Sequence, residues 1–293
     1  MSGMTDNASG PNKVYLNGRI VPEHEAVVSA FDSGFLHGAS TFSTLLAHNG
    51  VVFRIDRHLA RMMETVALLG LRCNQTPAGL RDAAYEVLRA NALQEARMRI
   101  TLTSGSIRGG EPAALVTAES LADYPKEWYT DGIGVIVTSF KQATGDPTFG
   151  YKTGCYLPRV LARQEAAAKG ADEALWFTAD NRLAEACFNN AFLVLAGKVL
   201  TPPRDTPVLP GIVREAVLEL ARSLGVPCDD QTPLTVHEML AADEVFLTGS
   251  TTGVRPVVRI ERHGVGNEKP GPVTMKLMQA YRQLLDKECP PPA

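Results

Sequence analysis

The sequence has few cysteines, no long apolar run and little net charge, and each shortage excludes a class of protein. Its five cysteines include no Cys-x-x-Cys pair, which argues against a disulfide framework and a zinc site and favours a reducing compartment. A formal net charge of -3 gives no sign of the excess positive charge that binding to nucleic acid or an anionic membrane requires. Residues 1–12 are polar and lack the apolar stretch of a signal peptide. We therefore expect a disordered leader over residues 1–12 of a cytoplasmic protein.

The sequence does contain enough apolar material for two hydrophobic cores. Its 293 residues, 45% of them hydrophobic, exceed what one core usually organises. An aperiodic stretch with Asp, Pro, Lys and Trp marks the connection between domains. We expect a small α+β domain over residues 13–120, a connection over 121–132, a large domain over 133–288 and a tail over 289–293.

The small domain is predicted to be a two-layer α+β unit. Asn-Gly pairs at 17–18 and 49–50 indicate hairpin turns. Asp56 is expected to cap an amphipathic helix that ends at Gly70, and a second helix is expected over residues 78–89. Between the last two strands, the glycine-rich residues 105–110 indicate a flexible loop with one cation. The predicted sheet segments are residues 14–17, 19–21, 26–31, 35–46, 51–54, 97–103 and 113–118.

The large domain is predicted to mix short strands with four helices. The predicted strands are residues 134–140, 173–177, 182–184, 191–195, 199–200 and 245–247. The predicted helices are residues 159–168, 212–224, 236–241 and 273–285.

One lysine, Lys152, lies in a turn directly before a long helix. Pro158 suits the first turn of that helix, where its missing N–H costs nothing, and Gly170 suits its end. A lysine anchored in this way can hold a carbonyl cofactor as a Schiff base if its surroundings free the amine. Taken alone, an ordinary solvated lysine is the commoner case.

Other segments offer groups for an anionic aromatic cofactor. Ile212 and Val213 begin a helix, so their N–H groups point outward with the positive end of the helix dipole behind them. Ser250 and Thr251 follow a strand and could donate hydroxyls to the same phosphate, and Arg61 could supply charge. Taken singly, these features are a helix start, a loop and a surface arginine.

Glu185 follows a strand among small residues and could be half-buried. A buried carboxylate needs a cation or a donor, and a protonated pyridine nitrogen would be one. The alternative is a capped turn.

Together these motifs resemble the fold-type-IV (class IV) pyridoxal-phosphate enzymes. That family contains branched-chain and D-amino-acid aminotransferases, R-selective amine transaminases and aminodeoxychorismate lyases. The resemblance extends from Val14 to about Leu285. Its motifs are Phe31-Asp32-Ser33-Gly34-Phe35, Arg57-His58-Leu59-Ala60-Arg61, Lys152-Thr153-Gly154-Cys155-Tyr156-Leu157, Gly170-Ala171-Asp172-Glu173-Ala174, Leu209-Pro210-Gly211-Ile212, Ala242-Asp243-Glu244-Val245-Phe246 and Lys269-Pro270-Gly271-Pro272.

The resemblance implies an α+β fold with an N-terminal two-layer α/β sandwich and a C-terminal α/β pseudo-barrel that binds pyridoxal 5′-phosphate. It also implies a homodimer. By position, Lys152 corresponds to the Schiff-base lysine, Glu185 to the partner of the pyridine nitrogen and Tyr156 to the tyrosine at the cofactor's phenolic oxygen. The implied phosphate ligands are Arg61, the N–H groups of Ile212 and Val213, and the hydroxyls of Ser250 and Thr251.

The substrate region departs from the branched-chain pattern. Branched-chain enzymes typically have an acidic residue and a glycine where Ala39 and Ser40 stand, Glu at Ser43 and a basic residue at Leu46. His37 is closer to the R-selective transaminases, and the Arg108 loop is similar to that of the lyases. Arg108 and Arg255 are candidates to bind a substrate carboxylate, although each could equally be a surface residue.

Three functions follow from the resemblance. The favoured one is an aminotransferase that moves an amino group between an amino acid or amine and a 2-oxo acid. The second is an aminodeoxychorismate lyase that releases pyruvate and an arylamine. The third is a non-enzymatic protein on the same fold, and the intact lysine, glutamate and phosphate-binding residues argue against it.

Overall fold

The computed structural model describes residues 12–291, which fall into two compact units. The first unit extends to Leu121 and also includes the chain from Cys289, and the second unit is Ala122–Glu288. Cys289 is fully buried, and its carbonyl oxygen accepts a 2.9 Å hydrogen bond from Asn49 Nδ2 in the first unit. Apart from Asn12, the predicted leader lies outside the described residues. Among the helices of the described part, none is long and apolar enough to cross a bilayer.

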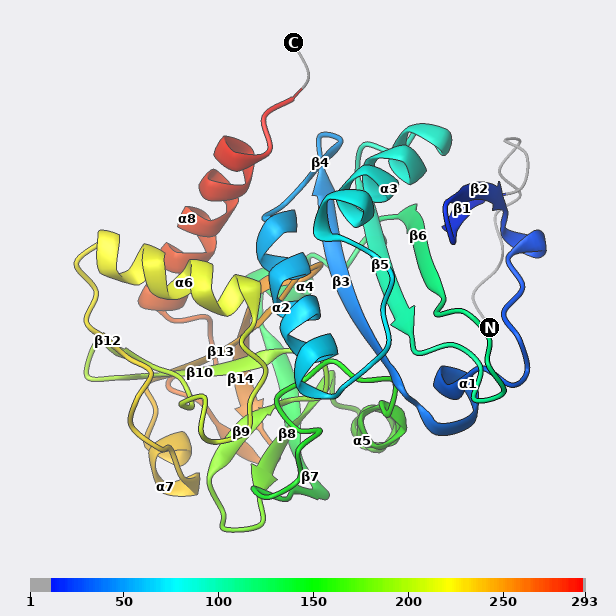
Figure 1. The fold of residues 1–293 in the computed structure, drawn as a ribbon. Coiled ribbons are helices and arrows are strands. Elements are labelled where there is room, and N and C mark those ends of the chain that lie inside the picture. Colours follow the sequence, from blue (N-terminus) through cyan, green and yellow to red (C-terminus); the bar gives the residue numbers. More distant parts are fainter. Residues whose placement is uncertain (1–11, 292–293) are drawn as a thin grey trace. The chain divides into compact units, whose positions relative to one another are not determined.

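The first unit is a six-stranded antiparallel sheet with two long helices against one face (Figure 1). Its strand order is β2-β1-β6-β5-β3-β4. The hairpin predicted at Asn17-Gly18 is confirmed by the pairing of β1 with β2. The elements are β1 (Lys13–Leu16), β2 (Arg19–Pro22), a 3-10 turn (Glu23–Glu25), α1 (Ser33–His37), β3 (Ser40–His48), β4 (Val51–Val52), α2 (Ile55–Leu68), α3 (Pro77–Ala90), β5 (Ala96–Thr103) and β6 (Ala114–Ser120).

The alternation of buried and partly exposed side chains along the strands explains how the sheet packs against the helices. Every second residue of β5 is buried, and Met98 and Ile100 belong to the same core as Leu59 of α2 and Leu80 of α3. A period of two in the strand and a period near 3.6 in the helices place both apolar faces together. The two predicted long helices and the last two strands of this unit are therefore confirmed.

The strand predicted over residues 26–31 and the start of the strand predicted over residues 35–46 are wrong. Residues 26–31 form no strand, and the side chains of Val27, Val28 and Phe31 are exposed. The segment that follows begins with a short helix, α1, because Asp32 accepts a hydrogen bond from the N–H of Gly34 and caps it. An apolar composition alone therefore did not produce a strand there.

The helix start expected at Asp56 also differs. The residue before the helix is Arg54, which has a left-handed backbone with φ of 48°, and its side chain makes no cap. Asp56 lies in the first turn, where its charge favours the positive end of the dipole and pairs with Arg81 of α3.

The second unit is built on a nine-stranded sheet that closes on itself. Its neighbours run β12-β11-β10-β13-β14-β7-β8-β9, and β9 pairs again with β10. Six strands therefore form a ring, which confirms the predicted pseudo-barrel. The strands are β7 (Ile133–Gln142), β8 (Glu173–Thr178), β9 (Leu183–Ala186), β10 (Asn190–Leu195), β11 (Lys198–Leu200), β12 (Cys228–Asp229), β13 (Glu244–Gly249), β14 (Gly253–Ile260) and β15 (His263–Gly264).

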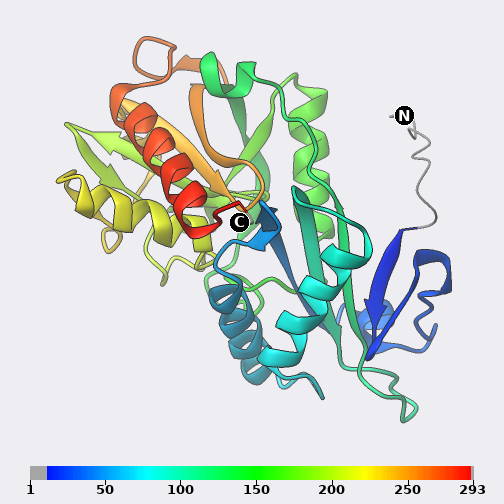
Figure 2. The same cartoon turned by 90° about the horizontal axis from the view of Figure 1, so that it is seen from above.

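Helices surround this ring. The helix α5 packs on β7 and β8, and α6 and α8 lie side by side (Figure 2). Within β8, Leu175 and Phe177 face the barrel core while Ala174 and Trp176 pack under α5. The strand is buried on both faces for this reason. The helices are α4 (Glu127–Thr130), α5 (Leu157–Ala168), α6 (Ile212–Ser223), α7 (Val236–Leu240) and α8 (Pro272–Glu288).

Candidate active site

Lys152 lies in the turn before α5, as predicted from the sequence. Its Nζ donates to the hydroxyl oxygen of Tyr156 across 3.2 Å and lies 5.2 Å from the centre of that ring. The helix begins at Leu157 with Pro158 in its first turn, and Gly170 beyond its end has a left-handed φ of 70°. The helix start therefore fixes the tyrosine beside the lysine.

Arg159, one turn further along α5, is a buried cation that was not predicted from the sequence. Its Nη2 donates to Oε1 of Glu185 across 2.5 Å. Its Nη1 donates to the carbonyl oxygens of Ala186 at 2.9 Å and Cys187 at 3.2 Å. The guanidinium therefore joins the helix that follows Lys152 to the strand that carries the glutamate.

Glu185 is more deeply buried than the half-exposure that its sequence suggested, at 4% exposed. Its Oε2 accepts from Asn190 Nδ2 at 3.3 Å and from the Leu209 N–H at 3.1 Å. With Arg159, the carboxylate has three donors from this chain. Because a carboxylate has about four acceptor positions, one position is left for a further donor.

The N-terminus of α6 lies beside this carboxylate. Gly211 precedes the helix and provides no side-chain cap for the first N–H groups, which belong to Ile212 and Val213. A Cβ on Gly211 would lie only 2.0 Å from Oδ1 of Asn190, so no larger residue fits there. Asn190 also donates to Leu209 O at 2.9 Å. One asparagine therefore holds the helix start against Glu185.

The turn that carries Ser250 and Thr251 belongs to the same region. Glu185, Asn190 and Thr248 lie abreast on β9, β10 and β13, and the turn follows directly after β13. The Thr251 hydroxyl lies 2.9 Å from the hydroxyl of Tyr124. The turn is therefore held in place by residues of the second unit.

Seven of the predicted residues thus lie along one connected region of the second unit. They are Lys152, Tyr156, Glu185, Ile212, Val213, Ser250 and Thr251. Two residues that connect them, Arg159 and Asn190, were not predicted. For Arg159, its place in the first turn of the helix, three residues after Tyr156, was an available signal. For Asn190, the strand pairings that place it were not visible in the sequence.

Arg255, a candidate for the substrate carboxylate, is buried on β14. Its Nη2 lies 3.8 Å from Oε2 of Glu173, and its guanidinium lies 4.9 Å from the centre of the Trp128 ring. Burial lowers the pKa of this guanidinium, and the negative charge of Glu173 opposes that change. The side chain therefore already has a counter-ion within its own unit.

Arg61 and His37 belong to the first unit. Arg61 is 8% exposed on α2, and its Nη2 donates to Ser43 Oγ at 3.2 Å. That hydroxyl lies 2.9 Å from Nδ1 of His58. His37 is exposed in the last turn of α1.

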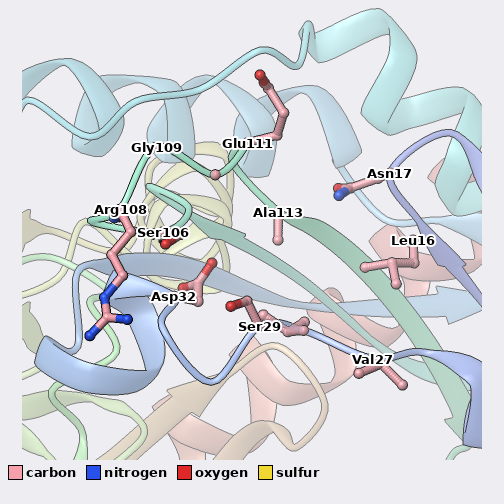
Figure 3. A pocket seen from close by; sticks show the side chains of 12 residues that line it. Leu16, Asn17, Val27, Ser29, Asp32, Ser106, Arg108, Gly109, Glu111 and Ala113 are labelled. Atoms are coloured by element: carbon pink, nitrogen blue, oxygen red, sulfur yellow. Dashed lines mark hydrogen bonds between the residues drawn. The ribbon is translucent and has the colours of Figure 1, made fainter.

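Arg108 lies on the loop predicted to be flexible and is exposed. Its guanidinium lies 3.9 Å from the centre of the Phe31 ring. Arg72 Nη2 donates to the carbonyl oxygens of Ser106 at 3.1 Å and Gly110 at 3.2 Å, so the loop is tied at both ends. The loop borders a hollow of about 420 Å³, with Arg108 at the end opposite Asn17 (Figure 3).

The sequence and the structure of this chain are both similar to those of known aminotransferases. A profile of the family described as "Amino-transferase class IV" matches residues 40–260. The branched-chain-amino-acid aminotransferase of Escherichia coli (strain K12) is 30% identical over 94% of this chain and 93% of its own. The structure of the T.th. branched-chain amino acid aminotransferase with pyridoxamine 5′-phosphate aligns at a TM-score of 0.89 and 27% identity over 96% of each chain. The branched-chain aminotransferase from Thermoproteus uzoniensis with norvaline aligns at 0.87 and 30% identity, over 95% of this chain and 96% of that one.

Proposed function

The chain belongs to the class IV aminotransferase family, and we propose that the connected region from Lys152 to the start of α6 is its catalytic centre. It is an enzyme dependent on pyridoxal 5′-phosphate. The observation that carries the proposal is the line of contacts from Lys152 through Tyr156 and Arg159 to Glu185.

The residues of the second unit fit this cofactor. The first N–H groups of α6 have no side-chain cap, and a helix start of this kind suits a phosphate. Glu185 has one acceptor position left for a ring nitrogen that carries a proton. The Lys152 amine and the Tyr156 hydroxyl are already adjacent. We assign Ser250, Thr251 and, from the resemblance, Arg61 as the further phosphate ligands.

When bound, pyridoxal phosphate supplies an electron sink for the substrate's Cα. With the cofactor bound, Lys152 Nζ would hold it and, once free, would act as the base that takes the substrate's Cα proton and as the acid that returns it. Glu185 would hold the proton of the ring nitrogen, and Tyr156 would orient the cofactor through its phenolic oxygen. Each role corresponds to the hydrogen-bonding capacity of that side chain.

We propose that the substrates are an amino acid and a 2-oxo acid. The relatives are named as branched-chain enzymes, but Ser43 here bonds to His58 and Arg61 where branched-chain enzymes typically have Glu. The donor therefore has to be determined by a panel of L-amino acids, D-amino acids, simple amines and aminodeoxychorismate, followed through bleaching of the bound cofactor. Bleaching by an amino donor and recovery with a 2-oxo acid are expected. Release of an arylamine without any acceptor would instead identify a lyase.

We propose that the enzyme acts in the cytoplasm as a homodimer. The dimer rests on the family resemblance, and the compartment rests on the cysteine spacing and modest charge of the sequence. Light scattering of the purified protein would test the dimer, and a mass of 31.6 kDa would contradict it.

Arg108→Ala is expected to raise KM for a carboxylate substrate about tenfold, while half-reaction rates with a simple amine barely change. A planar guanidinium can grip a carboxylate with two parallel bonds, and a charge-assisted bond of this kind contributes about 1.5 to 3 kcal/mol. Single-turnover kinetics with both substrate types would measure the difference. Arg108→Lys is the matched control, because it keeps the charge but loses the fork.

Equal losses with both substrate types would exclude Arg108 as the anchor. The same measurement on Arg255→Met tests the second candidate. Because Arg255 is the buried partner of Glu173, its loss is expected to lower the melting temperature and to affect both substrates alike. A KM effect confined to carboxylate substrates would move the anchor to Arg255.

A further inference from the structure

Arg159 occupies an unusual position for a buried cation. It is 9% exposed, and its two terminal nitrogens contact three acceptors on β9 and directly after it. The bond to Glu185 holds one carboxylate oxygen, while the bonds to Ala186 O and Cys187 O fix the guanidinium to the main chain. The carboxylate is therefore clamped to its own strand through an arginine of α5.

The charges around Arg159 come from several elements. Burial opposes its charge, but Glu185 on β9 and then Tyr156, which directly precedes α5, raise the pKa of the guanidinium above its ordinary value. Cys187, the third titratable neighbour, has a pKa raised to about 12 by its own burial, so it is neutral at physiological pH. The Trp176 ring of β8 lies 5.4 Å away and carries no charge.

The negative charge of Glu185 is therefore already neutralised by the positive charge of Arg159 within the same chain. A protonated ring nitrogen that takes the remaining acceptor position of Glu185 brings a second positive charge to a site where one is permanently present. Tyr156 lies between the same guanidinium, 5.5 Å from its ring centre, and the Lys152 amine. Arg159 thus contacts both Glu185, which is proposed to meet the ring nitrogen, and Tyr156, which is proposed to meet the phenolic oxygen.

We propose, on the basis of the function proposed above, that Arg159 is a positioning residue that clamps Glu185 and sets the pH range in which the bound cofactor keeps its protons. Its guanidinium disfavours an added proton nearby, so the cofactor loses its proton at a lower pH than it would beside Glu185 alone. Two unit charges about 6 Å apart at an effective dielectric constant of about 20 change a proton equilibrium by about two pH units.

The test compares Arg159→Met and Arg159→Lys with the wild-type holoenzyme. The absorbance of the bound cofactor is titrated from low to high pH, and the midpoint is recorded. Arg159→Met is expected to raise the midpoint by about one pH unit or more, and Arg159→Lys, which keeps the charge, to remain close to wild type. Arg163→Met is the matched control, because it removes the same charge one turn further along α5.

Two further measurements separate the proposal from a purely structural role. The melting temperature of each apoprotein reports the loss of the buried ion pair, and titration with pyridoxal phosphate reports cofactor affinity. A lower melting temperature with an unchanged midpoint in Arg159→Met would reduce Arg159 to a structural residue. If Arg159→Met does not fold, Arg159→Gln decides, because it removes the charge but keeps a donor for the main-chain carbonyls: a raised midpoint supports the proposal, and a midpoint equal to that of Arg163→Met overturns it.

A different result is expected if the proposed function itself is wrong. In that case the wild-type protein itself would take up no pyridoxal phosphate and would show no cofactor band at any pH. If wild-type protein takes up the cofactor and Arg159→Met titrates like Arg163→Met, only the role of Arg159 is wrong.

Discussion

Lys152→Ala is expected to bind pyridoxal 5′-phosphate without a covalent bond and to lose turnover by about 10⁴-fold or more. The change removes the amine that is proposed both to hold the cofactor and to move the Cα proton, and general acid–base catalysis alone contributes about 10²- to 10⁴-fold. The neighbouring Tyr156 hydroxyl, now 3.2 Å from Lys152 Nζ, would keep its place because the start of α5 fixes it. The phosphate binding proposed at the start of α6 would not depend on the lysine.

The measurement is borohydride reduction of the loaded protein, digestion and mass spectrometry. Wild-type protein is expected to carry the cofactor on the peptide that contains Lys152, and the variant is expected to carry none. Lys169→Ala is the matched control: it lies just after the same helix, and its partner is Glu165 on that helix. Cofactor on any peptide of Lys152→Ala would show that another amine is the anchor, and Lys169 would be tested first.

The lysine could be located from sequence because its signals are local. Pro158 and Gly170 mark the two ends of one helix, and both rules depend only on backbone sterics near each residue. The Asn17-Gly18 hairpin was predictable for the same reason. The strand predicted over residues 26–31 failed because it required a partner strand, and the chain provides none there among the described residues.

The hydrogen-bond donors of Glu185 could not be predicted from local sequence signals. Its three donors come from α5, β10 and the segment before α6, which only the closed ring of strands brings together. The strand β14 was also missed, since Arg255, Pro256 and Arg259 interrupt its apolar pattern. Long-range pairing, rather than local preference, therefore determines the electrostatics of this site.

Glu185→Gln is expected to lower turnover roughly 10²- to 10³-fold, a loss typical of removing one preorganised group from a catalytic site. An amide cannot hold the ring nitrogen protonated, so the electron sink weakens. Cofactor affinity should fall much less, because the start of α6 and the hydroxyls of Ser250 and Thr251 are unchanged. Arg61→Ala is the opposite case, with a larger loss of affinity than of turnover, since its charge is assigned to the phosphate.

The hydrogen bonds of Glu185 add a requirement to this test. Asn190 Nδ2 and the Leu209 N–H both donate to Glu185 Oε2, so an amide nitrogen at that position would face two donors. Arg159 would also lose its buried counter-ion, and breaking a buried pair costs about 3–5 kcal/mol. The melting temperature of the apoprotein must therefore be measured alongside turnover, with Glu185→Asp as the control that keeps the charge. If Glu185→Gln loses affinity as strongly as turnover, and Glu185→Asp behaves in the same way, the carboxylate holds the site together and does not act on the ring nitrogen.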